Sequence, residues 1–123
     1  MKIKTSELSG AALDWAVAKC EGLKVSKLGP GNKHGVWLVE GDSWYEKRSP
    51  YHPSTDWAQG GPIVERERIC LRDTGDDGDC VWEADNQRDS FGKYTGPTSM
   101  IAAMRCYVAS KLGDEVDVPE GLI

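Results

Sequence analysis

The sequence predicts an α+β fold in which a small, largely antiparallel sheet packs with two helices. Three observations predict it. Apolar residues recur at helical spacing near both ends of the chain, short apolar stretches separated by turn residues lie between them, and Gly/Pro-rich segments form long irregular loops. A chain of 123 residues is close to the usual size of one domain, so we expect a single domain over residues 1–123.

The first helix is predicted to begin after Ser9 and to end at Gly22. The Ser9 hydroxyl can accept a backbone hydrogen bond as N-cap, with Leu8 packing over Leu13. Gly22 can adopt the left-handed conformation that commonly ends a helix. A core-facing stripe runs between these two positions and is formed by Leu13, Ala16, Val17 and Cys20.

Short apolar segments after Gly22 are predicted to be strands. The run at 36–39 has no polar alternation, as expected for a strand covered on both faces, and 40–43 is a plausible hairpin connection. The acidic segment 73–79 is expected to be a solvated turn, because a calcium loop starting there would need Glu where the chain has Ala84. The expected strands cover 23–28, 35–39, 43–45, 63–71 and 81–84, with a short edge strand at the C-terminal end.

The second helix is predicted to follow Gly96 and Pro97, with Thr98 or a neighbour as its cap and Gly113 as its end. Arg105 lies in the middle of this helix, and its permanent charge must reach water, a carboxylate or an anionic ligand. The face expected to pack on the sheet is formed by Ile101, Met104, Val108 and Leu112.

Composition excludes several classes of function. A net charge of −5 argues against a nucleic-acid-binding protein, because affinity for phosphate backbones needs a basic face. No apolar run is long enough to span a membrane. The four cysteines are far apart without a Cys-x-x-Cys pair, which favours reduced thiols over disulfides or zinc. We therefore expect no metal and no cofactor.

The central segment from Tyr51 to Ile63 combines aromatic rings, a carboxylate, hydroxyls, paired glycines and three prolines. Prolines fix φ and remove backbone donors, whereas Gly60 and Gly61 permit close backbone approach. This mixture predicts a rigid, shaped loop of the kind that often carries function. The alternative is a tight corner whose Trp57 simply fills the core.

Catalysis has weak support in the sequence. His52, Ser54 and Asp56 supply the three residue types of a hydrolytic triad, but positions two apart on one loop rarely converge in the required geometry. The chain contains no nucleophile elbow and no phosphate-binding loop that ends in Lys-Ser/Thr. We therefore expect a protein that is not an enzyme.

Three stretches of the chain resemble the small phage NinX-type proteins, a domain of unknown function found in tailed phages and prophages. They are the opening 4–8 with 12–18, the central Pro-Ser-Thr-Asp-Trp-Ala-Gln-Gly-Gly-Pro-Ile at 53–63, and the closing 96–98 with 101–105. The resemblance implies a phage accessory protein that acts in the cytoplasm of the bacterial host. It assigns no catalytic residue.

The function we predict is binding without chemistry, with a nucleotide-like small molecule such as a host immune signal sequestered by the central loop. Rings can stack on a base, glycine amides can approach a phosphate, and fixed polar groups can bind a ribose or base edge. The alternative is an inhibitor or adaptor that binds a host or phage protein through exposed aromatic residues. A homodimer is a further expectation. The predicted ligand-binding residues are Tyr51, Ser54, Asp56, Trp57, Gly60, Gly61, Thr98 and Arg105.

Overall fold

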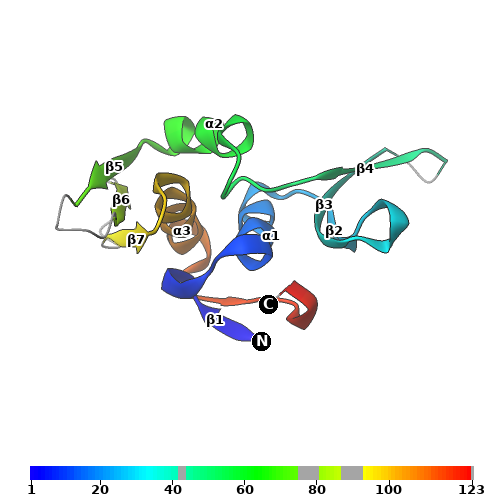
Figure 1. The fold of residues 1–123 in the computed structure, drawn as a ribbon, viewed down its shortest axis with the longest axis horizontal. Coiled ribbons are helices and arrows are strands. Elements are labelled where there is room, and N and C mark those ends of the chain that lie inside the picture. The colour runs from blue at the N-terminus through cyan, green and yellow to red at the C-terminus, as the bar shows by residue number, and fades with distance from the viewer. Residues whose placement is uncertain (42–43, 75–80, 87–92, 123) are drawn as a thin grey trace.

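The computed structural model describes residues 1–41, 44–74, 81–86 and 93–122. These residues form three α-helices and three small antiparallel sheets, which confirms the predicted α+β class (Figure 1). The single sheet of the prediction is divided into three, and a third helix lies where a loop was expected. The segments predicted as turns at 40–43 and 73–79 fall partly on 42–43 and 75–80, outside the described residues.

The three sheets lie at different edges of the molecule (Figure 1). One pairs β1 (Lys2–Lys4) with β8 (Glu115–Asp117) and brings the two ends of the chain together. Another joins β2 (Val25–Leu28), β3 (His34–Gly41) and β4 (Glu46–Pro50) in sequence order and projects away from the helices. The last joins β5 (Ile69–Asp73), β6 (Trp82–Asn86) and β7 (Tyr94–Gly96) and packs on α3.

The two predicted helices are confirmed. α1 spans Gly10–Glu21 and ends at Gly22, which has the expected positive φ of 68°. α3 spans Ser99–Leu112, and the Thr98 hydroxyl accepts the Ile101 amide as N-cap. One detail differs, because the Ser9 side chain makes no capping hydrogen bond. α3 is the centre of the core and buries its residues 100, 102–104 and 106–109.

The central segment contradicts the sequence interpretation, since residues 57–67 form helix α2 (Trp57–Glu67). The prediction of an irregular loop as far as Ile63 and of a strand over 63–71 is therefore wrong, and the strand β5 begins only at Ile69. Asp56 caps α2 by accepting the Ala58 amide. Interior Gly and Pro disfavour a helix, but Gly60 and Ile63 are buried, and this packing overrides local propensity.

Gly60 allows α2 to approach α3 closely. A Cβ atom at this position would lie 2.5 Å from both Met100 Sδ and the Pro53 carbonyl oxygen. The same atom on Gly61 would meet its nearest neighbour, Trp57 Cε3, at 3.7 Å, an ordinary contact. The two glycines therefore differ in role, since only Gly60 is required by packing.

Hydrogen bonds among Glu21, Arg66 and Tyr107 connect the three helices. The Arg66 guanidinium of α2 donates to both carboxylate oxygens of Glu21 in α1, at 3.0 and 2.8 Å. The Tyr107 hydroxyl of α3 donates to Glu21 at 2.7 Å. Partial burial raises the pKa of Glu21, but the hydrogen bonds from Arg66 and Tyr107 and the charges of Arg66 and Lys111 outweigh it and hold that pKa below its usual value.

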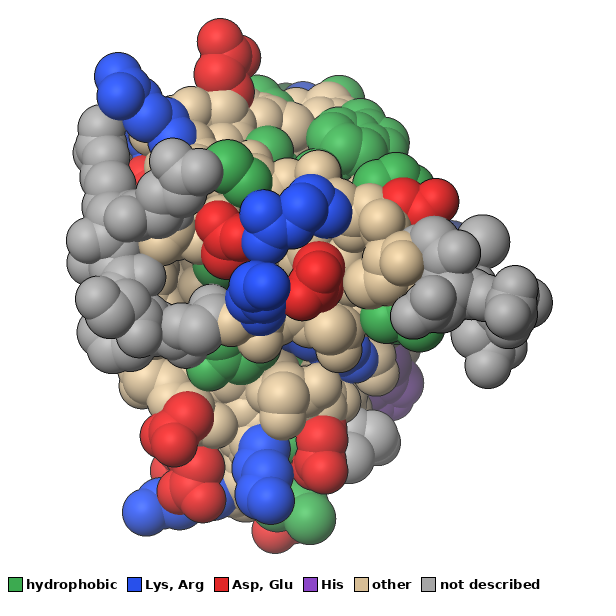
Figure 2. All heavy atoms as spheres, turned by 90° about the vertical axis from the view of Figure 1, so that its left-hand side faces the viewer, with side chains coloured by type: hydrophobic (Ala, Val, Ile, Leu, Met, Phe, Trp, Pro, Cys, Tyr) green, Lys and Arg blue, Asp and Glu red, His purple; other side chains and the backbone are tan. Residues whose placement is uncertain are grey.

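The helices and the surface of the described residues have three further features. None of the helices within the described ranges is long and apolar enough to cross a membrane. On the face where α3 and the β5–β6–β7 sheet lie, acidic and basic side chains are interspersed among the residues that are coloured (Figure 2). At the opposite end, Trp44 and Tyr45 precede β4 and expose 93% and 76% of their surface. The strand predicted at 43–45 is corrected by the structure, in which β4 begins at Glu46.

The difference between the two glycines is testable. We expect G60A to lower the free energy of unfolding by about 1–3 kcal/mol, because the added methyl group forces α2 and α3 apart. We expect G61A, the matched control, to raise it by about 0.5–1 kcal/mol, because alanine favours a helix and meets no clash. Urea denaturation measures both, and equal effects of the two substitutions would contradict this packing.

Candidate functional site

A hollow of about 370 Å³ lies where the β3–β4 hairpin leaves the helices, and we call it the Asp14 hollow. Its lining comes from three parts of the chain: Gly10, Ala11 and Asp14 on α1, residues 34–37 at the start of β3, and residues 50–52, 54 and 55 after β4. Two hydrogen bonds connect these parts, because the Tyr51 amide donates to the Val36 carbonyl and the Ser54 amide donates to Asp14 Oδ1, both at 2.9 Å.

Asp14 is the buried acidic residue in the lining of this hollow, with 5% of its surface exposed. Its Oδ1 atom accepts the backbone amide of Ser54 at 2.9 Å. Burial raises the pKa of the carboxyl, and it outweighs the opposing effects of Ser54 and of the nearby His52. A carboxyl with a perturbed pKa inside a concave site is a typical feature of functional sites.

The Ser54 side chain is buried, with 1% of its residue surface exposed, and its hydroxyl makes no hydrogen bond with good geometry to the described residues. The hydroxyl lies close enough to Asp14 to lower the pKa of that carboxyl, so the carboxyl and the hydroxyl are neighbours in the lining. A buried polar atom without a partner is costly for the fold. Such an atom in the lining of a hollow indicates that a ligand can supply the missing bond.

Rings and imidazoles surround these polar groups. The lining includes the aromatic residues Trp37 and Tyr51 and the two histidines of the chain, His34 and His52. Burial raises the pKa of the Tyr51 phenol to about 12, so it remains a neutral hydroxyl at physiological pH. The Gln59 side chain holds the segment in place, because it accepts the His52 amide at 2.6 Å and donates to the Pro50 carbonyl at 3.1 Å.

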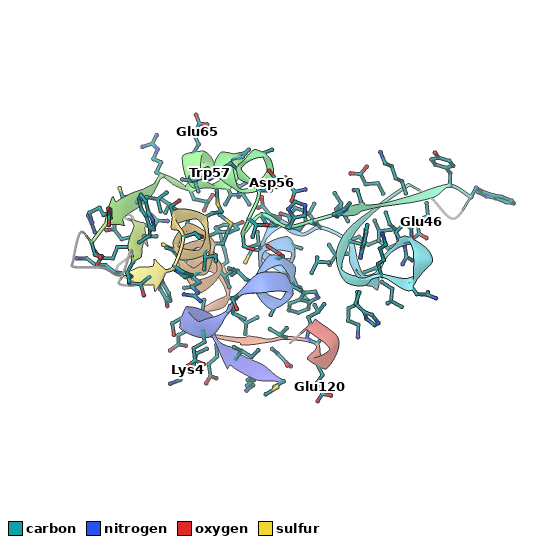
Figure 3. The ribbon with its side chains drawn as sticks, viewed as in Figure 1. Lys4, Glu46, Asp56, Trp57, Glu65 and Glu120 are labelled. Atoms are coloured by element: carbon teal, nitrogen blue, oxygen red, sulfur yellow. The ribbon has the colours of Figure 1, made fainter. Side chains whose placement is uncertain are left out.

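Two of the eight residues predicted from the sequence, Tyr51 and Ser54, line the Asp14 hollow. Asp56 and Trp57 lie at the start of α2 and are not among the lining residues (Figure 3). Asp56 caps the helix, and Trp57 exposes 55% of its surface. Gly60 and Gly61 lie within α2, where Gly60 packs against Met100.

The other two predicted residues belong to α3 and support the fold. Thr98 is the N-cap of that helix. Arg105 donates to the Leu8 carbonyl and the Thr95 carbonyl, both at 2.7 Å, and burial lowers its pKa. The charge of Arg105 is thus satisfied by two backbone carbonyl groups. The eight residues predicted from the sequence do not line one common cavity.

A larger hollow of about 580 Å³ lies beside the paired chain ends, between α1 and the segment 115–120. Its polar lining consists mainly of exposed groups, including Glu115, Asp117 and Glu120, and none of the eight predicted residues lines it. Size alone favours this hollow. We favour the Asp14 hollow because it contains buried polar groups that can fix the orientation of a ligand.

Asp14 is the important residue that the sequence prediction did not select. It stands between Leu13 and Trp15 on a helix whose buried residues are otherwise apolar or alanine. A charged residue beside the apolar stripe of a helix is usually a solvated side chain, so its position gave a weak signal. The packing of the Ser54 backbone over α1 is what buries it.

Removal of the Ser54 hydroxyl should stabilise the fold. We expect S54A to raise the free energy of unfolding by about 1 kcal/mol, because a buried hydroxyl without a partner is lost and the cavity left is small. Urea denaturation of the wild type and of S54A measures the change. A clear loss of stability would show instead that the hydroxyl is well bonded to Asp14 in solution.

Comparison with known proteins places the chain in a phage family. A search of curated proteins found no match. The family model described as Bacteriophage P22, NinX matches residues 4–111, a range that contains all three α-helices except Leu112 and the whole lining of the Asp14 hollow. The resemblance predicted from the sequence motifs is thus confirmed. The chain belongs to the Bacteriophage P22 NinX family.

Proposed function

We propose that this phage-family protein binds a nucleotide-like small molecule in the Asp14 hollow and sequesters it without chemical conversion. The observation that carries the proposal is the pair of buried polar groups, the Asp14 carboxyl and the unbonded Ser54 hydroxyl, in a hollow that rings also line. Its volume of about 370 Å³ falls within the range typical of small-molecule sites. The family supports a phage accessory role.

The chemistry of the lining favours a flat, nitrogen-containing ring. A carboxylate accepts hydrogen bonds from ring N–H or exocyclic amino groups, and a hydroxyl can donate or accept at a neighbouring position. Trp37 and Tyr51 are the aromatic residues of the lining, and a base bound there would contact their rings. These three types of contact are the ones that distinguish a base from an aliphatic ligand.

The geometry also supports binding over catalysis. A serine nucleophile needs a hydrogen bond to a general base. The Ser54 hydroxyl has no hydrogen bond of good geometry to such a base within the described residues. Asp14 accepts a backbone amide, which suits a positioning group.

Release of a bound compound tests the proposal. Protein purified from phage-infected bacteria is heat-denatured, and the released small molecules are identified by mass spectrometry. We expect the wild type to release a nucleotide-like compound and S54A and D14N to release about ten-fold less, because one good hydrogen bond in a buried site is worth about that factor.

A matched substitution distinguishes this site from the loop site predicted by the sequence. D56N keeps a good N-cap on α2 and lies outside the hollow, so it should release as much compound as the wild type. Loss of the compound in D56N alone would favour the central loop as the site. Absence of any nucleotide-like compound from repeated wild-type preparations would contradict sequestration.

One observation favours the alternative of a protein-binding inhibitor or adaptor. Trp44 and Tyr45 are highly exposed beside β4 on the projecting hairpin, and such residues are preferred anchors at protein interfaces. This alternative predicts that the tagged wild type captures one dominant host protein and that W44A/Y45A does not. Equal recovery by both proteins would remove its support.

A further inference from the structure

The N-terminus of α1 opens onto the Asp14 hollow. Gly10 and Ala11, the first two residues of the helix, line the hollow. The first amides of a helix have no partners within the helix, and together with the helix dipole they form a site that attracts anions. Ser9 makes no capping hydrogen bond through its side chain, and the first turn contains no acidic residue. No carboxylate of the first turn therefore competes for these amides.

Gly10 keeps this end of the helix accessible. Its φ is +56°, and a Cβ atom built on it would have no neighbour within 4 Å. The left-handed conformation requires glycine here, since most other residues would be strained in it. A ligand can thus approach the backbone from the side on which a side chain would project.

A second observation, independent of the helix end, indicates a ligand in the same hollow. The Ser54 hydroxyl is buried, lines the same hollow and lacks a hydrogen-bond partner of good geometry among the described residues. Two imidazoles, those of His34 and His52, also belong to the lining and can donate to an anion. The hollow therefore combines these donors with the buried Asp14 carboxyl, beside which Ser54 lies.

The spacing of these groups defines the shape of the ligand. Gly10 and Asp14 are four residues apart on one helix, so they lie about one turn, or about 5–6 Å, from each other on the same face. A phosphate close to Asp14 would be repelled when that carboxyl is ionised. A ligand that directs its ring to Asp14 and its phosphate to Gly10 separates the two charges and satisfies both groups.

We infer that the ligand of the Asp14 hollow is a nucleoside monophosphate or a related compound, whose phosphate binds the first-turn amides of α1. This inference rests on the proposed function and adds a second, anionic subsite to it. It also identifies Gly10 and Ala11, which the sequence prediction did not select, as residues of the binding site.

Calorimetry with defined probes tests the phosphate subsite. The four common ribonucleosides and their 5′-monophosphates are titrated into the wild type, S9D and T95D. We expect at least one monophosphate to bind about ten-fold more tightly than its uncharged nucleoside, because charge-assisted hydrogen bonds hold the phosphate. S9D supplies a carboxylate N-cap that occupies the amides, so it should lose this advantage and keep the affinity for the nucleoside.

T95D is the matched control, because it adds the same charge at an exposed position of β7 outside the hollow. It should retain the full preference for the monophosphate. A second readout is the amide NMR spectrum, in which the signals of Gly10 and Ala11 should shift with the monophosphate and with inorganic phosphate but not with the nucleoside.

The outcomes separate the two claims. Equal affinities for a nucleoside and its monophosphate, with unmoved Gly10 and Ala11 signals, would overturn the phosphate subsite and leave the proposed function in place. Failure of all eight probes to bind would overturn both. An equal loss in S9D and T95D would assign the effect to net charge and would also overturn the subsite.

Discussion

The architecture around the site depends on one interaction, the hydrogen bond from the Ser54 amide to the buried carboxyl of Asp14. A bond of this type to a charged acceptor contributes about 1.5–3 kcal/mol. It fixes residues 51–55 over α1, and the Tyr51 amide in turn fixes the start of β3. The hollow exists because these two bonds hold a turn, a helix and a hairpin in one arrangement.

The two polar side chains at this contact, Asp14 and Ser54, lower the stability of the fold at the place where we propose that a ligand binds. A carboxyl and a hydroxyl buried side by side disfavour folding unless each is well bonded. The fold tolerates them because its stability comes from elsewhere, above all from the apolar surroundings of α3 and the bonds between Glu21, Arg66 and Tyr107. Sites that locally disfavour the fold are common where ligands bind.

Sequence reasoning succeeded where a single local rule decided the outcome. The end of α1 at Gly22 and the cap of α3 at Thr98 follow from such rules, and both are confirmed. It failed at α2, where Gly60, Gly61 and Pro62 oppose a helix and only tertiary packing on α3 reveals one. The site followed the same pattern: Tyr51 and Ser54 were selected as part of an unusual segment, whereas the role of Asp14 depends on a contact across 40 residues that no local pattern shows.

The most direct test of the account is an NMR titration of the Asp14 side-chain carboxyl carbon. Because the carboxyl is buried, its pKa in the ligand-free protein should lie above that of an ordinary aspartate. Binding of a nucleoside or its monophosphate should then lower this pKa, because ring N–H groups stabilise the ionised form. An ordinary pKa that no probe changes would show that Asp14 is solvated and that the hollow is not a binding site.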